Sequence, residues 1–196
     1  MCDDASIIWT DRIDDAWIDL PPSRIGDVPP GLGTPAQYIL FAAGDQPALR
    51  VDAYRSPGEA FAFQDALVWH GFLVIGWGEH AYLLDVKSRS IVKHPLGSSF
   101  GHLYADERYL LIASAERLRR LETNGSQSWT SEMLGIDGVV VERVSDVSST
   151  AAASGIRRAV GNRSAFDWRR ANSSFEFRQT TFCCGIRSAL SKQRCC

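Results

Sequence analysis

The sequence has no long apolar run, which argues against a membrane-spanning protein. Its longest strongly apolar stretch, Phe72 to Trp77, is far shorter than the roughly 20 residues that a helix needs to cross a bilayer. The chain also opens with Met1-Cys2-Asp3-Asp4, without the basic and apolar segments of a secretory signal peptide. We therefore expect a cytoplasmic protein with no membrane partner.

An excess of charge of one sign is also lacking, because 21 basic residues stand against 23 acidic ones and give a net charge of −2. This balance argues against a nucleic-acid partner. The two parts of the chain nevertheless differ. Residues 147–196 carry nine basic and two acidic residues, a net charge of +7, which leaves −9 for residues 1–146. Such a difference usually marks a boundary between two parts of a chain.

Motifs of nucleophilic catalysis and of cofactor binding in their usual context are missing as well. The short patterns G-x-S-x-G and S-x-x-K occur once each, at residues 97–101 and 90–93, but neither precedes a predicted helix, and the cysteines lie outside the middle of the chain. The pairs Cys183-Cys184 and Cys195-Cys196 lack the C-x-x-C spacing of a zinc site. Gly31-Leu32-Gly33 lacks the lysine of a phosphate loop. We therefore expect neither a metal nor any other cofactor.

What the sequence does contain, from residue 38 to residue 144, is a series of short apolar blocks separated by turn residues. Blocks rich in Val, Ile, Leu and aromatic residues are typical of strands, and Asn124-Gly125 favours a hairpin turn. The sequence therefore predicts an all-β fold built as an antiparallel meander. The predicted strands are Tyr38–Ala42, Ala48–Tyr54, Ala60–Phe63, Ala66–Trp69, Phe72–Gly76, Ala81–Val86, Ile91–Lys93, Tyr109–Ala113, Leu118–Leu121 and Gly138–Val144.

This region contains an internal sequence repeat with a spacing of 37 residues. Leu73-Val74-Ile75 corresponds to Leu110-Leu111-Ile112, and Glu79 corresponds to Glu116. Gly76 likewise corresponds to Ala113. Periods of roughly 40 residues that hold several short strands are typical of propeller blades, which must stack on neighbours to bury both faces.

These residues resemble bacterial β-propeller repeats of the PQQ-like and WD40-like kind. The resemblance rests on Phe72–Gly76 followed by Tyr82–Asp85, and on Tyr109–Ala113 followed by Leu118–Leu121, which are similar to the middle strands of a blade. A closed propeller needs at least about four blades, which 196 residues do not supply at this period. The resemblance therefore implies an incomplete, propeller-like assembly of hairpin repeats over residues 36–146.

The two ends of the chain differ from its middle in amino-acid composition. Residues 1–35 are dense in Pro and Gly and predict an arm or loop, with Trp9 and Trp17 as anchors against the domain. Residues 147–196 are rich in Ser, Arg, Ala and Cys without alternation. They predict either a poorly ordered basic tail or the product of a slipped reading frame.

The slipped frame is a hypothesis that synonymous codons make testable. Codons chosen for Val147 to Trp168 and read one nucleotide out of step permit the string GVIDGSGEWDPPGGWEPFRFRL. This string has the Gly, Pro and Trp spacing of another hairpin and would restore the pattern of the preceding domain. The coding DNA decides between the two interpretations.

Candidate functional residues are aromatic, histidine and acidic side chains near the predicted turns. Aromatic residues with nearby carboxylates are typical of protein-binding surfaces, although a Trp in a strand-rich domain more often belongs to the core. Carboxylates at Asp3, Asp4, Asp11, Asp14 and Asp15 are able to attract a basic partner, although scattered surface carboxylates usually serve solubility alone. The candidate binding residues are Trp69, Trp77, Glu79, His80, Tyr82, His102 and Tyr104.

Two functions remain open on the sequence alone. The first is a non-enzymatic protein-interaction module of unknown partner, such as a bacterial cognate-binding or immunity protein. The second is a small hydrolase-like enzyme that uses His70, His80 or His102 with Glu79. Two histidines that converge on a carboxylate would favour the enzyme, and histidines dispersed over the fold would favour the interaction module.

Overall fold

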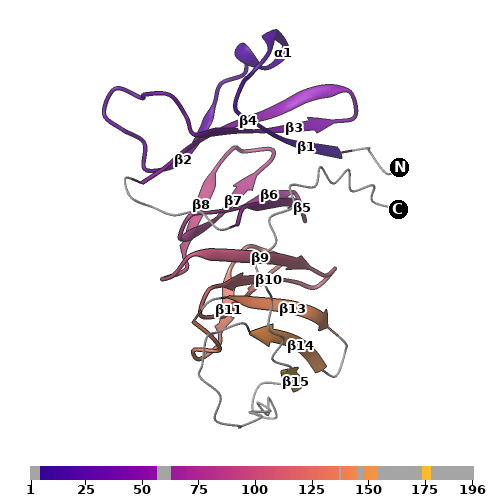
Figure 1. Ribbon diagram of the computed structural model, residues 1–196. Helices are drawn as coiled ribbons and strands as arrows, with labels where there is room; N and C mark the ends of the chain where they lie inside the picture. Colours follow the sequence, from indigo (N-terminus) through magenta and orange to yellow (C-terminus); the bar gives the residue numbers. More distant parts are fainter. Residues whose placement is uncertain (1–4, 57–62, 137, 145–147, 154–173, 178–196) are drawn as a thin grey trace.

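The computed structural model describes residues 5–56, 63–136, 138–144, 148–153 and 174–177 (Figure 1). The described part of the chain consists of fifteen strands and a single four-residue helix, α1 (Asp15–Ile18). The strands form three sheets of four strands and one sheet of three. No helix within these ranges is long and apolar enough to span a membrane.

The four sheets follow one another along the chain, and we number them in that order. The first has the strand order β1 (Ala5–Thr10), β3 (Gln37–Ala43), β4 (Gln46–Tyr54), β2 (Ser23–Gly26). The second is a meander of β5 (Asp65–Trp69), β6 (Phe72–Trp77), β7 (His80–Asp85), β8 (Ile91–Pro95). The third is a meander of β9 (Phe100–Ala105), β10 (Tyr109–Ser114), β11 (Leu118–Glu122), β12 (Gln127–Thr130). The fourth contains β13 (Val139–Val144), β14 (Ser148–Ala153), β15 (Ser174–Phe177).

The sheets are stacked face to face, from the first sheet near the N-terminus to the fourth (Figure 1). The strand that begins each sheet lies beside the one that begins the next, because β1 contacts β5, β5 contacts β9, and β9 contacts β13. We call these four the leading strands. The second and third sheets each lie between two others and are covered on both faces. Their inner strands β6 and β10 are therefore continuous apolar runs with almost every residue buried.

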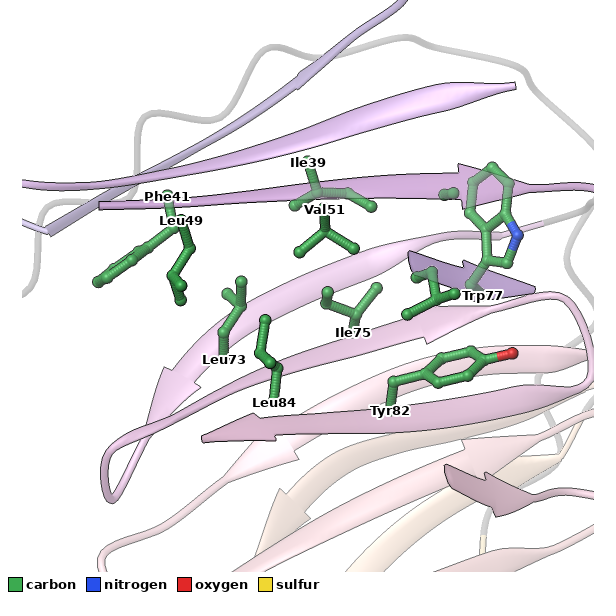
Figure 2. Close-up of a cluster of buried hydrophobic side chains, with 11 residues drawn as sticks. Ile39, Phe41, Leu49, Val51, Leu73, Ile75, Trp77, Tyr82 and Leu84 are labelled. Carbon is green, nitrogen blue, oxygen red and sulfur yellow. The ribbon is translucent and has the colours of Figure 1, made fainter. Parts of the chain in front are cut away.

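Figure 2 shows the core between the first and second sheets. Side chains of β3 and β4 point toward those of β6 and β7, and all of the labelled residues are buried. These residues are Ile39, Phe41, Leu49, Val51, Leu73, Ile75, Trp77, Tyr82 and Leu84. A second core, with Val74, Leu83 and Phe100 among its members, joins the second and third sheets. A third core joins the third sheet to Val139 and Val141 of β13.

Contacts between the second and third sheets join residues one sequence period apart. The Trp69 indole Nε1–H donates to the carbonyl oxygen of Asp106 at 2.7 Å, across 37 residues. The turns that close the two sheets are also matched: the Leu96 amide donates to the Glu79 carbonyl, and the Leu134 amide donates to the Glu116 carbonyl, both at 2.8 Å. The residues that correspond in the sequence repeat therefore make corresponding hydrogen bonds in the second and third sheets.

The prediction of an all-β fold with antiparallel meanders is confirmed, and most predicted blocks coincide with strands. The sequence missed β9 and β12, as well as both strands before residue 36. Residues 60–62 of the predicted strand Ala60–Phe63 lie outside the described residues, and Phe63 is not in a strand.

The prediction of an arm or loop over residues 1–35 is wrong for Ala5–Thr10 and Ser23–Gly26, which are strands. Strand β1 pairs antiparallel with β3, and β2 pairs parallel with β4, so both belong to the first sheet. The physical reason is alternation in β1, where Ile7 and Trp9 face the first core. Trp9 stacks on Trp77 with ring centroids 6.1 Å apart, and Trp17 is buried, so both tryptophans anchor this segment as predicted.

Most of the basic segment 147–196 lies outside the described residues. Two short pieces of it are strands, so the prediction that strands end at residue 146 is wrong there. Strand β14 pairs antiparallel with β13, and β15 pairs parallel with β14. The slipped reading frame stays a prediction.

Candidate functional site

The four histidines lie on different elements of the second and third sheets. His70 is in the exposed turn after β5, where its Nε2 lies 2.6 Å from the Glu107 carbonyl oxygen. His80 begins β7, with its ring 5.8 Å from the ring of Tyr82. His94 is in β8 and His102 is in the leading strand β9.

A carboxylate and an imidazole meet where β5 lies beside β9. The Asp65 Oδ2 atom is 3.9 Å from His102 Nδ1, and the two side chains are 40% and 41% exposed. This distance is too long for a hydrogen bond. Asp65 also accepts a hydrogen bond from the Leu103 amide at 3.4 Å. The pair therefore resembles a loose ion pair at a half-open sheet edge.

Asp65 is held in a setting that favours its protonated form. Burial raises the pKa of Asp65 above its ordinary value of 3.8, while the Leu103 amide, the His102 imidazole and the Ala66 amide act in the opposite direction. A carboxyl group with a raised pKa beside an imidazole is a starting point for acid–base chemistry. Asp65 was not among the residues that the sequence singled out. The signal that points to it is the spacing, because Asp65 and His102 are 37 residues apart.

A second pair of titratable groups, His94 and Arg119, lies between the same two sheets. Burial and the Arg119 guanidinium lower the pKa of His94 below 6.5, while a hydrogen bond with the Gly125 backbone acts against them. Burial, followed by Arg117, lowers the pKa of Arg119 as well. Arg119 is fixed by hydrogen bonds to the Leu96 carbonyl at 2.9 Å and to the Gln127 side chain at 3.0 Å. These contacts join the sheets and serve packing.

Three of the aromatic residues that were predicted to bind a partner belong to the core. Trp69, Trp77 and Tyr82 are each at most 5% exposed, so they offer no surface to a partner. The Trp77 Nε1–H donates to the Tyr54 carbonyl at 3.0 Å, and the Tyr82 hydroxyl accepts from the Gly26 amide at 3.1 Å. Their role is to hold the second sheet against its neighbours.

The other predicted residues remain at least partly accessible but do not form one site. Glu79 is exposed in the turn between β6 and β7, and His80 is partly buried next to it. Tyr104, on β9, packs at the margin of the third core. An ion pair joins the predicted residue His102 to a carboxylate, and its partner is Asp65 instead of Glu79.

A surface with binding character lies on the outer face of the first sheet. There, residues 11–20, which include α1, cover Leu40 and Ala42 with the buried ring of Trp17. We call residues 11–20 together with Ile8 the acidic cap. Ile8 and Ile18 are 47% and 51% exposed. Ile8 is paired with Leu40 across β1 and β3, so its side chain is on the same face. The exposed carboxylates of the cap are Asp11, Asp14, Asp15 and Asp19.

Two further features bear on ligands. An open pocket of about 470 Å³ lies beside the loop after β2, in the segment that the sequence predicts as an arm or loop. Its lining residues are Asp27, Val28, Pro29, Pro30, Thr34, Ala36, Tyr54 and Arg55. Within the ranges that the structure describes, no group of three or more His, Cys, Asp or Glu side chains is placed to hold a metal ion.

Comparison with known proteins adds no relative. No protein-family model matches the chain, and no curated protein or solved structure matches it significantly.

Proposed function

We propose that this protein is a non-enzymatic interaction module that binds a basic protein partner through the acidic cap. The observation that carries the proposal is the pair of exposed isoleucines, Ile8 and Ile18, among four exposed carboxylates. Exposed apolar side chains ringed by charge are typical of protein-binding surfaces, in which central apolar residues supply most of the binding energy. A cognate-binding or immunity protein of the kind bacteria use fits this chemistry.

Charge supports a basic partner in preference to an acidic one. Between residues 11 and 20 the cap carries four aspartates and one arginine, Arg12. Arg50, which donates to the Ile18 carbonyl of the cap at 3.3 Å, is already bound to Asp52 through two hydrogen bonds of 2.8 and 3.0 Å. Residues 1–146 together carry a net charge of −9. Complementary charge of this kind accelerates the encounter with a basic protein and disfavours acidic ones.

The scaffold in this proposal is a set of propeller-like repeats. The second and third sheets share one strand order, and their leading strands lie side by side. Stacked repeats need an end whose outer face is protected from solvent and from further stacking. The acidic cap would serve as that end for the first sheet and would leave a surface free for a partner.

A second candidate function is acid–base catalysis at Asp65 and His102. It replaces the combination of Glu79 with His70, His80 or His102 that the sequence suggested. The raised pKa of Asp65 favours it. The dispersion of the histidines weighs against it, since catalysis of hydrolysis usually needs a nucleophile or a second acid–base group within hydrogen-bond reach.

The experiment compares three forms of the full chain immobilised on a resin: the natural chain, Ile8→Ser with Ile18→Ser, and Val92→Ser. Val92 lies on β8 and is 47% exposed, the same fraction as Ile8, so it is a matched control. Bacterial extract fractionated into basic and acidic proteins is passed over each resin, and the retained proteins are quantified by mass spectrometry.

We expect the natural chain and Val92→Ser to retain the same basic proteins, and the cap variant to lose them. Retention should also weaken with salt, because exposed charges are screened. Equal retention by the cap variant would contradict the proposal. Hydrolysis of a general ester substrate that His102→Gln abolishes would instead favour the second candidate.

A further inference from the structure

The second strand of the fourth sheet differs in kind from the second strands of the two preceding meanders. In β6 and β10 these positions carry Leu73-Val74-Ile75 and Leu110-Leu111-Ile112, which are at most 1% exposed. Strand β14 reads Ser-Ser-Thr-Ala-Ala-Ala and contains no side chain larger than Thr. Because stabilisation by burial grows with apolar area, about 25 cal/mol per Å², β14 has little to contribute. Its partner β13 carries Val139 and Val141, which are buried against the third sheet.

The end of β6 and the end of β10 share a pattern of a small residue, any residue, a small residue and Glu. It reads Gly-Trp-Gly-Glu over residues 76–79 and Ala-Ser-Ala-Glu over residues 113–116. The structure explains the first small position, because a Cβ at Gly76 would overlap the ring of Phe100 from the next sheet. Ala113, at the equivalent position, is fully buried in the core that also contains Val139.

The backbone carbonyl of the last position makes the same contact in both sheets, a contact open to any residue type. Glu79 accepts a hydrogen bond from the Leu96 amide, and Glu116 accepts one from the Leu134 amide. In both places the chain leaves the sheet through a Leu-Gly pair, at residues 96–97 and 134–135. The pattern thus marks the turn after the second strand in each of the two sheets.

Synonymous codons permit the same pattern in the neighbouring reading frame of the next repeat. In a frame displaced by one nucleotide, each new codon takes its first base from the third position of one codon and its other two bases from the next codon. Only the first base is open to synonymous choice at most positions. Under this constraint the codons for Ala-Ala-Ala-Ser at 151–154 permit Gly-Ser-Gly-Glu. This third copy falls 38 residues after the second.

The rest of the displaced string fits the same repeat. If one G has been lost between the codons for Asp146 and Val147, the restored codon GGT places Gly directly after Asp146, and Asp-Gly is a strong signal for a tight hairpin turn. Val and Ile follow at positions 148 and 149, where the second strand of a sheet is apolar. Phe-Arg-Phe-Arg-Leu then falls at positions 164–168, with the alternation of a half-buried strand.

We infer that the residues after Asp146 are translated one nucleotide out of step with the sheets that precede them, and that the displaced frame encodes the remaining strands of the fourth sheet. The change of net charge from −9 to +7 at this point is then a consequence of reading the codons out of step. This inference does not depend on the proposed function, since it concerns a part of the chain remote in sequence from the acidic cap.

The nucleotide sequence of the coding region tests the inference. We expect the Thr150, Ala152 and Ala153 codons to end in G, the Ala151 codon to end in A, and Ser154 to be encoded by AGT, whose last base also begins the Trp codon that follows. No stop codon should interrupt the displaced frame between residues 147 and 168. A TCN codon for Ser154 would overturn the inference, because the displaced codon would then end in TC and would not encode Glu.

A stability measurement tests the same inference through the protein. The natural chain is compared with a chain in which the displaced string replaces residues 147–168, and with one that carries the same string in permuted order. We expect only the ordered string to raise the midpoint of thermal unfolding, by several degrees, because only it supplies apolar residues in register with β13. Equal midpoints for the ordered and permuted strings would overturn the inference.

Discussion

The substitution Gly76→Ala has two opposing effects on the stability of the fold. Glycine in a strand costs backbone entropy, so alanine there would stabilise the fold by roughly 0.5–1 kcal/mol if nothing stood in the way. At Gly76 the ring of Phe100 occupies the space that a Cβ needs. Overpacking of a core costs about 1–3 kcal/mol. The net expectation is a loss of about 1 kcal/mol, because the difference between these two effects spans about 0–2.5 kcal/mol.

The assay is urea unfolding followed by tryptophan fluorescence, with the midpoint and slope fitted for each variant. Gly101→Ala is the matched control, because the heavy atom nearest to its added Cβ is the Ala113 carbonyl oxygen at 3.3 Å, a tight but tolerable contact. Phe100→Leu removes the ring edge, so Gly76→Ala should cost less in that background. We expect a coupling energy of about 1 kcal/mol between the two positions. A Gly76→Ala chain at least as stable as the natural chain would refute the face-to-face packing of the second and third sheets.

Three further substitutions test the charged and polar contacts. Because the pKa of Asp65 is raised in the fold, the native state binds more protons than the unfolded state just above pH 3.8, so stability falls as the pH rises through that window. Asp65→Asn should remove this fall and stabilise the protein at pH 7. An unchanged profile of stability against pH would contradict this prediction. Because the pKa of His94 is lowered, stability should fall as the pH drops below 6.5. His94→Gln should flatten that part of the profile of stability against pH. An equal slope in both proteins would contradict the lowered pKa of His94. Trp69→Phe removes the hydrogen bond to the Asp106 carbonyl and should cost about 0.5–1.5 kcal/mol in urea unfolding, plus the loss of indole packing; a neutral result would mean that the indole is not engaged between the two turns.

The strands of the second and third sheets were predictable because their cores are covered on both faces. Phe72–Trp77 and Tyr109–Ser114 are apolar at nearly every position, which leaves a strong signal in the sequence. The leading strand β9 was missed because Gly101 and His102 interrupt its apolar residues where the strand faces the open edge of the stack. Strand β1 was missed for another reason: its pairing partner, β3, lies about thirty residues further along the chain, at Gln37–Ala43.

The candidate site was less predictable than the fold. Aromatic residues near turns were assigned to a binding surface, but Trp69 and Trp77 are covered by the neighbouring sheets that stacking brings over them. Asp65 and His102 come together only because equivalent positions of two stacked sheets lie side by side, which the 37-residue spacing encodes without naming the contact. The exposure of Ile18 depends on how α1 lies over the first sheet, and local sequence carries no signal for that.

The central claim is that consecutive sheets of this chain stack face to face with their equivalent strands in contact. The most direct test is a nuclear Overhauser experiment on the full chain with labelled phenylalanine and glycine. The account predicts strong cross-peaks between the ring protons of Phe100 and the α-protons of Gly76. Phe100 ring protons that show cross-peaks only to residues of the third sheet would contradict it.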